Sequence, residues 1–224
     1  MGGFCHMPAM HPRSDFVIKY DFSGEIATIS LSRPEKANSL TADMLGRLRE
    51  LVQEVMGRPE MRALVLTGEG KVFSAGADLD EARNGLALSP LWEELSSAVA
   101  KLPCLTIAAL NGTVAGGALG MVLACDLRLA VPTAKIFYPV MRLGFLPQPS
   151  DVMRLRALIG PARTAMILMA GQKIEADRAF EWGLIDAIVD GDTLHDHAAM
   201  LATDALSASP GHVQGIKRMI FGQE

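Results

Sequence analysis

The segment from Cys104 to Cys125 contains 22 residues without a charge, and it limits the kinds of fold that the chain can adopt. A helix that spans a membrane needs about 20 predominantly apolar residues. The pair Asn111-Gly112, a strong turn signal, lies in the middle of this run, and Gly116-Gly117 follows it. Only eight of the 22 residues are Leu, Ile, Val or Met. The sequence therefore predicts two shorter elements around a turn, and not a transmembrane helix.

The rest of the chain alternates between strand and helix patterns. FVIKYDF and EIATISL, separated by Ser23-Gly24, are typical of an antiparallel hairpin, and apolar spacing predicts a helix from Thr41 to Met56 with Thr41 as its N-cap. RALVLTG and CLTIAAL have the all-apolar character of parallel strands, and LWEELSSAVAKL between them is a predicted helix. The predicted later elements are the helix GGALGMVLAC, the strands DLRLAV and LIDAIV, and helices at 150–159, 162–170, 175–182, 193–207 and 210–221. This order indicates an α/β core followed by a helical C-terminal part.

Composition and charge exclude several classes of protein. The 224 residues suit one domain, with 50% hydrophobic and 21% charged residues. A net charge of −4, no run of Lys or Arg, and few aromatic residues argue against a nucleic-acid partner. Two cysteines, Cys104 and Cys125, lie in apolar stretches, so we interpret them as small buried hydrophobic residues in a reducing compartment.

The opening segment MGGFCHMPAMHPR has neither the basic nor the apolar region of a secretory signal. We expect residues 1–15, which include Cys5, His6 and His11, to form a flexible N-terminal segment. The expected location is the cytoplasm, with no membrane partner.

Two glycine-rich stretches are candidates for ligand binding. AGGALG (115–120) departs from the GxGxxG pattern of a dinucleotide fingerprint, because its glycines are spaced GGxxG and a turn precedes them. LTGEGKVFSAGADL (66–79) places small residues where the main chain could approach a ligand, and successive N–H groups there could bind an anion. Taken alone, each stretch would favour a tight turn packed against a neighbouring strand.

Three ordered motifs together resemble the crotonase superfamily, the enoyl-CoA hydratase/isomerase family. They are SRPEKANSL (32–40), LTGEGKVFSAGADL (66–79) and AALNGTVAGGALGMVLACDLRLA (108–130), and IGPARTAMILMAGQKIEADRAFEWGLIDAIV (159–189) resembles its downstream helical signature. The resemblance covers residues 16–220. It implies an α/β fold built as a spiral of ββα repeats over residues 16–190. Residues 191–224 would be a C-terminal helical trimerisation region, shorter than is usual for the family.

The resemblance also implies a site for an acyl-CoA thioester, with no additional cofactor and no metal. The backbone N–H groups of Ala77 and Gly117 would bind the thioester oxygen as an oxyanion hole, with the positive end of the helix from Gly117 directed at the same oxygen. The CoA moiety would contact Ser74, Ala75, Gly76, Asp78 and Leu79, with Lys36 and Ala37 at its side.

The sequence departs from the family at its two catalytic glutamates. By alignment of the motifs these positions are Gly120 and Val140, neither of which can transfer a proton. Asp151 is a candidate replacement, and an equally weighted interpretation is that it N-caps the following helix. Tyr138 is a second candidate, although it and Arg142 fit structural or surface roles better.

The remaining polar candidates have structural interpretations. Asp78 should hold the shape of its loop, although both it and Glu81 would lie near the CoA, and Asp80 and Asp126 should be solvated or capping groups. His195 and His197 lie two residues apart on a predicted helix and make a poor metal pair.

The predicted function is therefore the binding of an acyl-CoA and the stabilisation of its enolate, with decarboxylation or isomerisation favoured over efficient hydration. The alternative is a non-catalytic acyl-CoA carrier or sensor, and a dinucleotide-dependent oxidoreductase ranks third. We expect a homotrimer or a dimer of trimers. Apolar candidates for burial in the helical part are Met166, Ile167, Met169 and Trp182.

Overall fold

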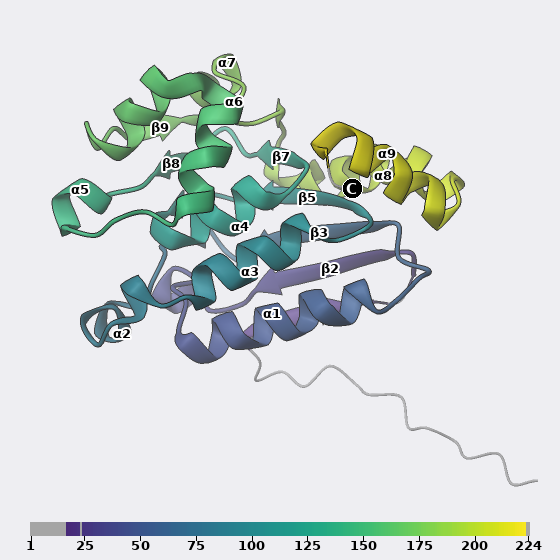
Figure 1. Ribbon diagram of the computed structural model, residues 1–224, viewed down its shortest axis with the longest axis horizontal. Coiled ribbons are helices and arrows are strands. Elements are labelled where there is room, and N and C mark those ends of the chain that lie inside the picture. Colours follow the sequence, from purple (N-terminus) through teal and green to yellow (C-terminus); the bar gives the residue numbers. More distant parts are fainter. Residues whose placement is uncertain (1–16, 23, 223–224) are drawn as a thin grey trace, which may run out of the picture.

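The computed structural model describes residues 17–22 and 24–222 as a mixed α/β fold with two sheets and surrounding helices (Figure 1). Residues 1–15, with Cys5, His6 and His11, lie outside the described residues, and so does Ser23 of the predicted turn.

The elements follow one another as a nearly regular alternation of strands and helices. The strands are β1 (Ile18–Asp21), β2 (Ile26–Leu31), β3 (Ala63–Gly68), β4 (Val72–Ser74), β5 (Leu105–Leu110), β6 (Thr113–Ala115), β7 (Leu127–Ala130), β8 (Lys135–Phe137), β9 (Ile174–Glu175) and β10 (Ala187–Ile188). The helices are α1 (Ala42–Met56), α2 (Leu79–Arg83), α3 (Leu91–Ala100), α4 (Leu119–Ala124), α5 (Val140–Leu143), α6 (Pro149–Leu168), α7 (Ala176–Glu181), α8 (Leu194–Ser207) and α9 (Pro210–Phe221). Short 3₁₀ helices cover Pro34–Lys36, Leu86–Leu88, Gly116–Ala118 and Gly191–Thr193.

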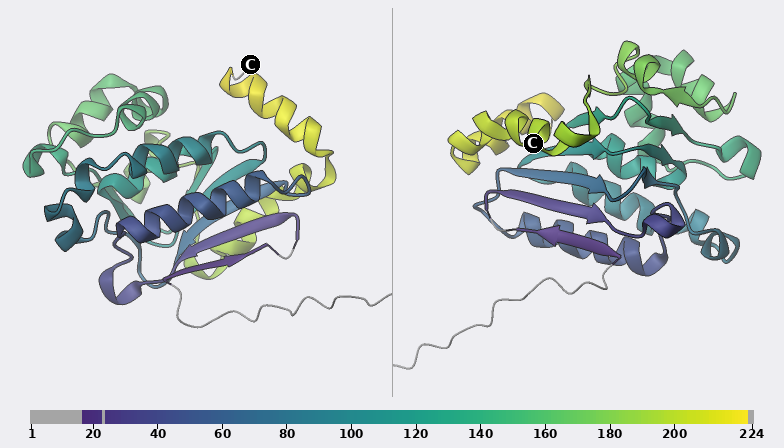
Figure 2. Two further views of the ribbon diagram at one scale, coloured as in Figure 1. Left: turned by 60° about the horizontal axis from the view of Figure 1, so that its bottom comes forward. Right: turned by 180° about the vertical axis from the view of Figure 1, so that it is seen from behind.

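The larger sheet has the strand order β1-β2-β3-β5-β7-β10. Strands β1 and β2 pair antiparallel, as predicted, and all other neighbours in this sheet are parallel. Every residue of β3 is buried, and β5 is buried at all positions except its first. Helices α1 and α3 cover one face and α8 packs on the other, so these strands need apolar side chains in both directions (Figure 2).

Helix α1 follows the sequence prediction closely. Thr41 is its N-cap, and the Thr41 hydroxyl accepts a hydrogen bond from the Met44 N–H at 3.2 Å. Its buried residues recur every three or four positions and face the core: Met44, Leu45, Leu48, Leu51, Val52 and Val55.

The smaller sheet has the order β4-β6-β8-β9, and its first three strands each follow a strand of the larger sheet directly. The chain thus repeats a strand, a short strand and a helix, which is the predicted ββα spiral. The turn at Asn111-Gly112 joins β5 to β6, and a Cβ at Gly112 would lie 2.0 Å from the Lys71 carbonyl oxygen. This close approach explains why position 112 is occupied by glycine. No helix within the described residues is long and apolar enough to cross a membrane.

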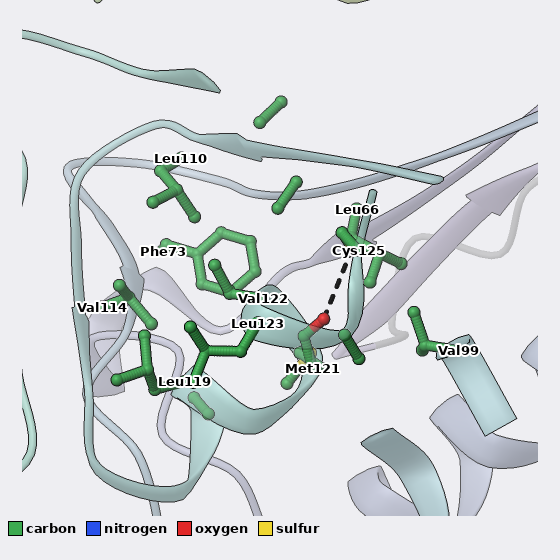
Figure 3. Close-up of a cluster of buried hydrophobic side chains, with 14 of the residues drawn as sticks. Leu66, Phe73, Val99, Leu110, Val114, Leu119, Met121, Val122, Leu123 and Cys125 are labelled. Carbon is green, nitrogen blue, oxygen red and sulfur yellow. Dashed lines mark hydrogen bonds between the residues drawn. The ribbon is translucent and has the colours of Figure 1, made fainter. Parts of the chain in front are cut away.

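The first turns of the spiral enclose an apolar core (Figure 3). Phe73 from β4 packs among Leu110, Val114 and Val122, all with at most 1% of their surface exposed. Cys104 and Cys125 are buried free thiols, as predicted, and burial raises the pKa of Cys104 to about 11. This core supports the backbone of β4, β6 and α4, which carries the glycine-rich segments.

The C-terminal part is helical, as predicted, and α6 contains the expected break. Gly160 has a φ of 75° and precedes Pro161, so the helix kinks between the two predicted segments. Ile167 and Trp182 are buried within the chain, whereas Met169 is 66% exposed.

Helix α9 is tied to the sheet by a buried ion pair. The Lys217 ammonium donates to the Cys104 carbonyl at 2.9 Å and to the Asp126 carboxylate at 2.8 Å. Asp126 also accepts the Thr106 N–H at 2.8 Å. The interpretation of Asp126 as a solvated or capping group is therefore wrong, because its charge is largely buried and paired across the fold.

Candidate active site

The loop after β4 is held in a fixed shape by the Ser74 hydroxyl and by Gly76. The buried Ser74 hydroxyl donates to the Asn38 carbonyl at 2.8 Å and accepts the Gly76 N–H at 3.1 Å. Gly76 has a φ of 92°, and the Ala75 N–H donates to the Ala37 carbonyl at 2.9 Å. The buried Ser74 side chain thus shapes the loop and is not itself free to meet a ligand.

Hydrogen bonds on both sides of Ala77 orient its N–H. Leu40 donates its N–H to the Gly76 carbonyl and accepts the Asp78 N–H with its own carbonyl, each at 2.8 Å. Amide groups along an extended segment point alternately to opposite sides. The Ala77 N–H consequently points away from Leu40, and it donates to no group among the described residues.

The turn after β6 approaches this loop backbone to backbone. A Cβ at Gly76 would lie 2.8 Å from the Ala115 carbonyl oxygen and 3.4 Å from the Gly116 Cα. Gly116, with a φ of 58°, begins the 3₁₀ helix that continues into α4. Gly117 is in its first turn, where N–H groups have no partner within the helix. A Cβ at Gly117 would lie 2.9 Å from the Trp92 ring. Gly76 and Gly117 therefore have a steric reason that only the folded chain reveals, and Gly116 is favoured by its positive φ.

Ala77 and Gly117 line one cavity of about 140 Å³. Its wall is mainly apolar and includes Trp92, Tyr138 and Val140. An apolar wall strengthens any hydrogen bond made inside, because little water competes for it. The structure thus brings the two predicted amides together with the candidate residue Tyr138 and with Val140, one of the two positions that lack a glutamate.

The segment that was predicted to lie beside the CoA, Lys36-Ala37, forms a rigid turn. Lys36 ends a short 3₁₀ helix and is exposed, and Ala37 and Asn38 both adopt the left-handed conformation, with φ values of 50° and 51°. The Asn38 side chain accepts the Arg33 N–H at 2.8 Å and donates to the Glu69 and Val72 carbonyls at 2.9 and 2.7 Å. Sequence reasoning missed Asn38, although asparagine tolerates this backbone conformation better than most residues.

Asp78 holds the following loop, as predicted. Its carboxylate accepts from the Arg33 guanidinium at 2.9 Å and caps α2 by accepting the Asp80 N–H. The hydrogen bond from Arg33 is the main reason that the pKa of Asp78 lies below its usual range. Leu79 beside it is 74% exposed. Glu81 accepts the Ala42 N–H at the start of α1, so it too has a structural partner.

Asp151 lies next to one of the two positions that lack a glutamate. Its side chain is fully buried in the first turn of α6, and Gln148, not Asp151, is the N-cap. The N-cap interpretation is therefore wrong. A Cβ at Gly120 of α4 would lie 2.8 Å from Asp151 Oδ1, and that oxygen has no hydrogen-bond partner among the described residues. Burial is the main cause that raises the pKa of Asp151 to about 7.

Tyr138 connects Asp151 to the cavity. Its hydroxyl donates to Asp151 Oδ2 at 3.1 Å, and Tyr138 lines the cavity together with Val140. Tyr138 is only 5% exposed, so the surface interpretation is wrong for this residue, whereas Arg142 is exposed. Burial and the neighbouring Asp151 carboxyl raise the pKa of Tyr138 far above its usual range.

Two further charged groups lie near Asp151. The Arg154 guanidinium is 4.0 Å from Asp151 Oδ1 and donates to the Ser150 hydroxyl at 2.8 Å. The Glu93 carboxylate of α3 accepts from that hydroxyl at 2.9 Å. Within the described residues, no three His, Cys, Asp or Glu side chains are grouped to hold a metal ion.

Known proteins resemble this chain over most of its length. A family profile described as enoyl-CoA hydratase/isomerase matches residues 21–222. The chain is 32% identical over 216 residues to 4-chlorobenzoyl coenzyme A dehalogenase-2 of Arthrobacter, covering 92% of this chain and 78% of the dehalogenase. It is 33% identical over 198 residues to 1,2-epoxyphenylacetyl-CoA isomerase of Escherichia coli K12, covering 84% and 75% respectively. The crystal structure of an enoyl-CoA hydratase from Bacillus anthracis superimposes with a TM-score of 0.85 at 32% identity, covering 92% of this chain and 82% of the hydratase.

Proposed function

Because this chain belongs to the enoyl-CoA hydratase/isomerase family of the crotonase superfamily, we propose that it is an enzyme that stabilises the enolate of an acyl-CoA thioester. The thioester oxygen lies between the backbone N–H groups of Ala77 and Gly117. The observation that carries this proposal is the shared cavity in which neither amide has a partner among the described residues.

The chemistry of a thioester explains why two backbone amides can supply the main stabilisation of the transition state. When the carbon next to the carbonyl loses a proton or a carboxylate, the new negative charge collects on the thioester oxygen. Fixed donors bind that oxygen more strongly in the transition state than in the substrate, and this difference accelerates the reaction. The CoA moiety lies along the backbone of residues 74–79 and beside Lys36 and Ala37. The thioester itself supplies the reactive group, so no further cofactor is part of the proposal.

The residues around the amides favour isomerisation or decarboxylation over hydration. Gly120 and Val140 supply no carboxylate where the family has its two glutamates, and each missing acid or base lowers a rate by roughly 10²–10⁴-fold. Decarboxylation generates the enolate directly and needs little help from a base. The similar proteins include a dehalogenase and an isomerase of CoA thioesters, so one scaffold carries different reactions.

The second candidate function is a non-catalytic acyl-CoA carrier or sensor. Val140 favours it, because this buried apolar side chain lines the cavity at a position where the family has a carboxylate. A carrier would keep the amides and the cavity but would leave the thioester unchanged.

Three thioesters separate these functions. We expect the protein to convert a 3-enoyl-CoA or methylmalonyl-CoA, and to hydrate crotonyl-CoA slowly or not at all, with products followed by mass spectrometry. Binding of all three without conversion would favour the carrier, and binding of none would contradict the proposed function. Rapid hydration of crotonyl-CoA would contradict the preference for isomerisation or decarboxylation.

We further propose that the chain assembles as a homotrimer or a dimer of trimers. The support is a set of large apolar side chains left exposed on the helices and loops of the second half of the chain: Met141, Leu143, Leu146, Met153, Met169, Met219, Ile220 and Phe221. Exposed apolar side chains of this kind are typical of subunit interfaces. Light scattering at micromolar concentration should give at least three times the 24.0 kDa of one chain, and a monomer would contradict the assembly.

A further inference from the structure

The carboxyl of Asp151 occupies the space beside Gly120 that a side chain on α4 would otherwise fill. A Cβ at Gly120 would lie 2.8 Å from Oδ1, 3.3 Å from Oδ2 and 3.4 Å from the carboxyl carbon of Asp151. Any side chain on α4 at this position would therefore require the Asp151 carboxyl to move. The glycine at position 120 thus leaves the space that the Asp151 carboxyl occupies.

Asp151 does not line the cavity, but Tyr138 does, and the Tyr138 hydroxyl bonds to Asp151 Oδ2 at 3.1 Å. Building on the enolate chemistry proposed above, we propose that Tyr138 and Asp151 form a proton relay that replaces the family's glutamates. Tyr138 is the catalytic residue that touches the substrate, and Asp151 is the group behind it that takes up the proton.

The relay moves two protons and leaves the phenol neutral. The Tyr138 oxygen takes a proton from the carbon next to the thioester carbonyl while its own hydroxyl proton passes to Asp151 Oδ2. The electron pair of the broken C–H bond becomes the enolate, whose oxygen is held by the Ala77 and Gly117 amides. The reverse transfer returns a proton to carbon. A relay that both removes and returns protons fits an isomerase, and it also supplies the proton that quenches the enolate after decarboxylation.

The environments of the two groups support this division of roles. Burial disfavours a free Tyr138 phenolate, so the tyrosine needs a partner that accepts its proton as it acts. Burial also raises the pKa of Asp151 to about 7, where a carboxyl can take up and release a proton near neutral pH.

Three helices pack around the pair, and two of them carry charges that face it. Arg154 of α6 lies 4.0 Å from Oδ1 and favours the ionised carboxylate, whereas Glu93 of α3 disfavours it. Gly120 of α4 adds no charge. The balance of these groups leaves Asp151 able to exist in both protonation states.

Hydrogen exchange at the carbon next to the carbonyl of butyryl-CoA tests the relay. In D₂O the wild-type protein should introduce deuterium there, detected by mass spectrometry. Tyr138→Phe and Asp151→Asn should each lower the exchange rate by about 10²-fold or more, with little change in Kd for butyryl-CoA. The matched controls are Tyr20→Phe and Asp80→Asn, which make the same chemical changes at exposed positions and should leave exchange unchanged.

The pH profile of exchange is a second readout, and its wild-type part does not depend on the folding of any variant. The wild-type rate should rise with pH through a single ionisation near 7, because the relay requires ionised Asp151. In Asp151→Asn this dependence should disappear.

The outcomes separate the relay from the proposed function. If the wild-type protein does not bind butyryl-CoA, both are overturned. Binding without exchange overturns the relay and favours a carrier. If exchange is retained in either relay variant, or if the wild-type rate is flat between about pH 5.5 and 8.5, the relay is wrong while enolate stabilisation stands.

Discussion

Replacing Gly117 with proline should lower the rate of conversion of the acyl-CoA substrate by about 10²–10³-fold, the usual effect of removing one oxyanion donor. Proline has no N–H, so the thioester oxygen would keep only the Ala77 amide. Affinity for an enolate-like CoA analogue should fall more than affinity for a plain acyl-CoA, because the donor is worth about 1–3 kcal/mol to a charged oxygen and nearer 1 kcal/mol to a neutral one. Steady-state kinetics and titration calorimetry measure both effects.

The matched control for this substitution is Gly117→Ala. Any side chain at this position meets the Trp92 ring at 2.9 Å, so both variants disturb the packing of the buried indole, but only alanine keeps the N–H. Circular dichroism and melting should show that both variants are folded. Equal losses in the two variants would mean that the effect comes from the Trp92 contact, and the donor role of Gly117 would be contradicted.

Replacing Asp151 with asparagine should remove a pH dependence of stability worth roughly 4 kcal/mol. The pKa of Asp151 is about 7 in the folded protein and near 3.8 in an unfolded chain. Between these values the folded state retains a proton that the unfolded state has released. The contribution to the free energy of unfolding is therefore fully present below pH 4 and is lost as the pH rises through 7. Asparagine resembles the protonated carboxyl and should not show this loss.

Urea unfolding at pH 5, 6, 7 and 8 measures the difference. The stability of Asp151→Asn relative to wild type should increase over this range, so that the variant is the more stable protein at pH 8. Asp80→Asn is the control, because it makes the same chemical change at an exposed position. A constant difference for Asp151→Asn would show that the buried carboxyl has an ordinary pKa.

Much of the fold could be predicted because the relevant signals are local. Thr41 and the apolar spacing after it define α1, and the all-apolar runs define β3 and β5, since strands covered on both faces have no polar side. The strands of the smaller sheet were not predicted as a separate sheet. Strands such as Val72–Ser74 and Lys135–Phe137 are three residues long, too short to show an alternating pattern.

The candidate site was predictable only where it is made of backbone. The glycines around Gly117 carry a recognisable pattern, whereas the surroundings of Asp151 arise from three elements that are distant in sequence. Nothing near Asp151 in the chain indicates that it faces Gly120 and Tyr138, and a helix N-cap was an equally good interpretation. Asp126 shows the same limit, because its partner Lys217 lies 91 residues away.

The central claim is that the Ala77 and Gly117 amides bind and polarise the oxygen of an acyl-CoA thioester. An infrared difference spectrum of butyryl-CoA labelled with ¹³C at the carbonyl reports on that oxygen directly. We predict that the C=O stretch of the bound ligand lies at a lower wavenumber than in buffer, because two fixed donors in an apolar cavity polarise the bond more than water does. A bound thioester whose C=O stretch equals or exceeds the value in buffer would contradict the account.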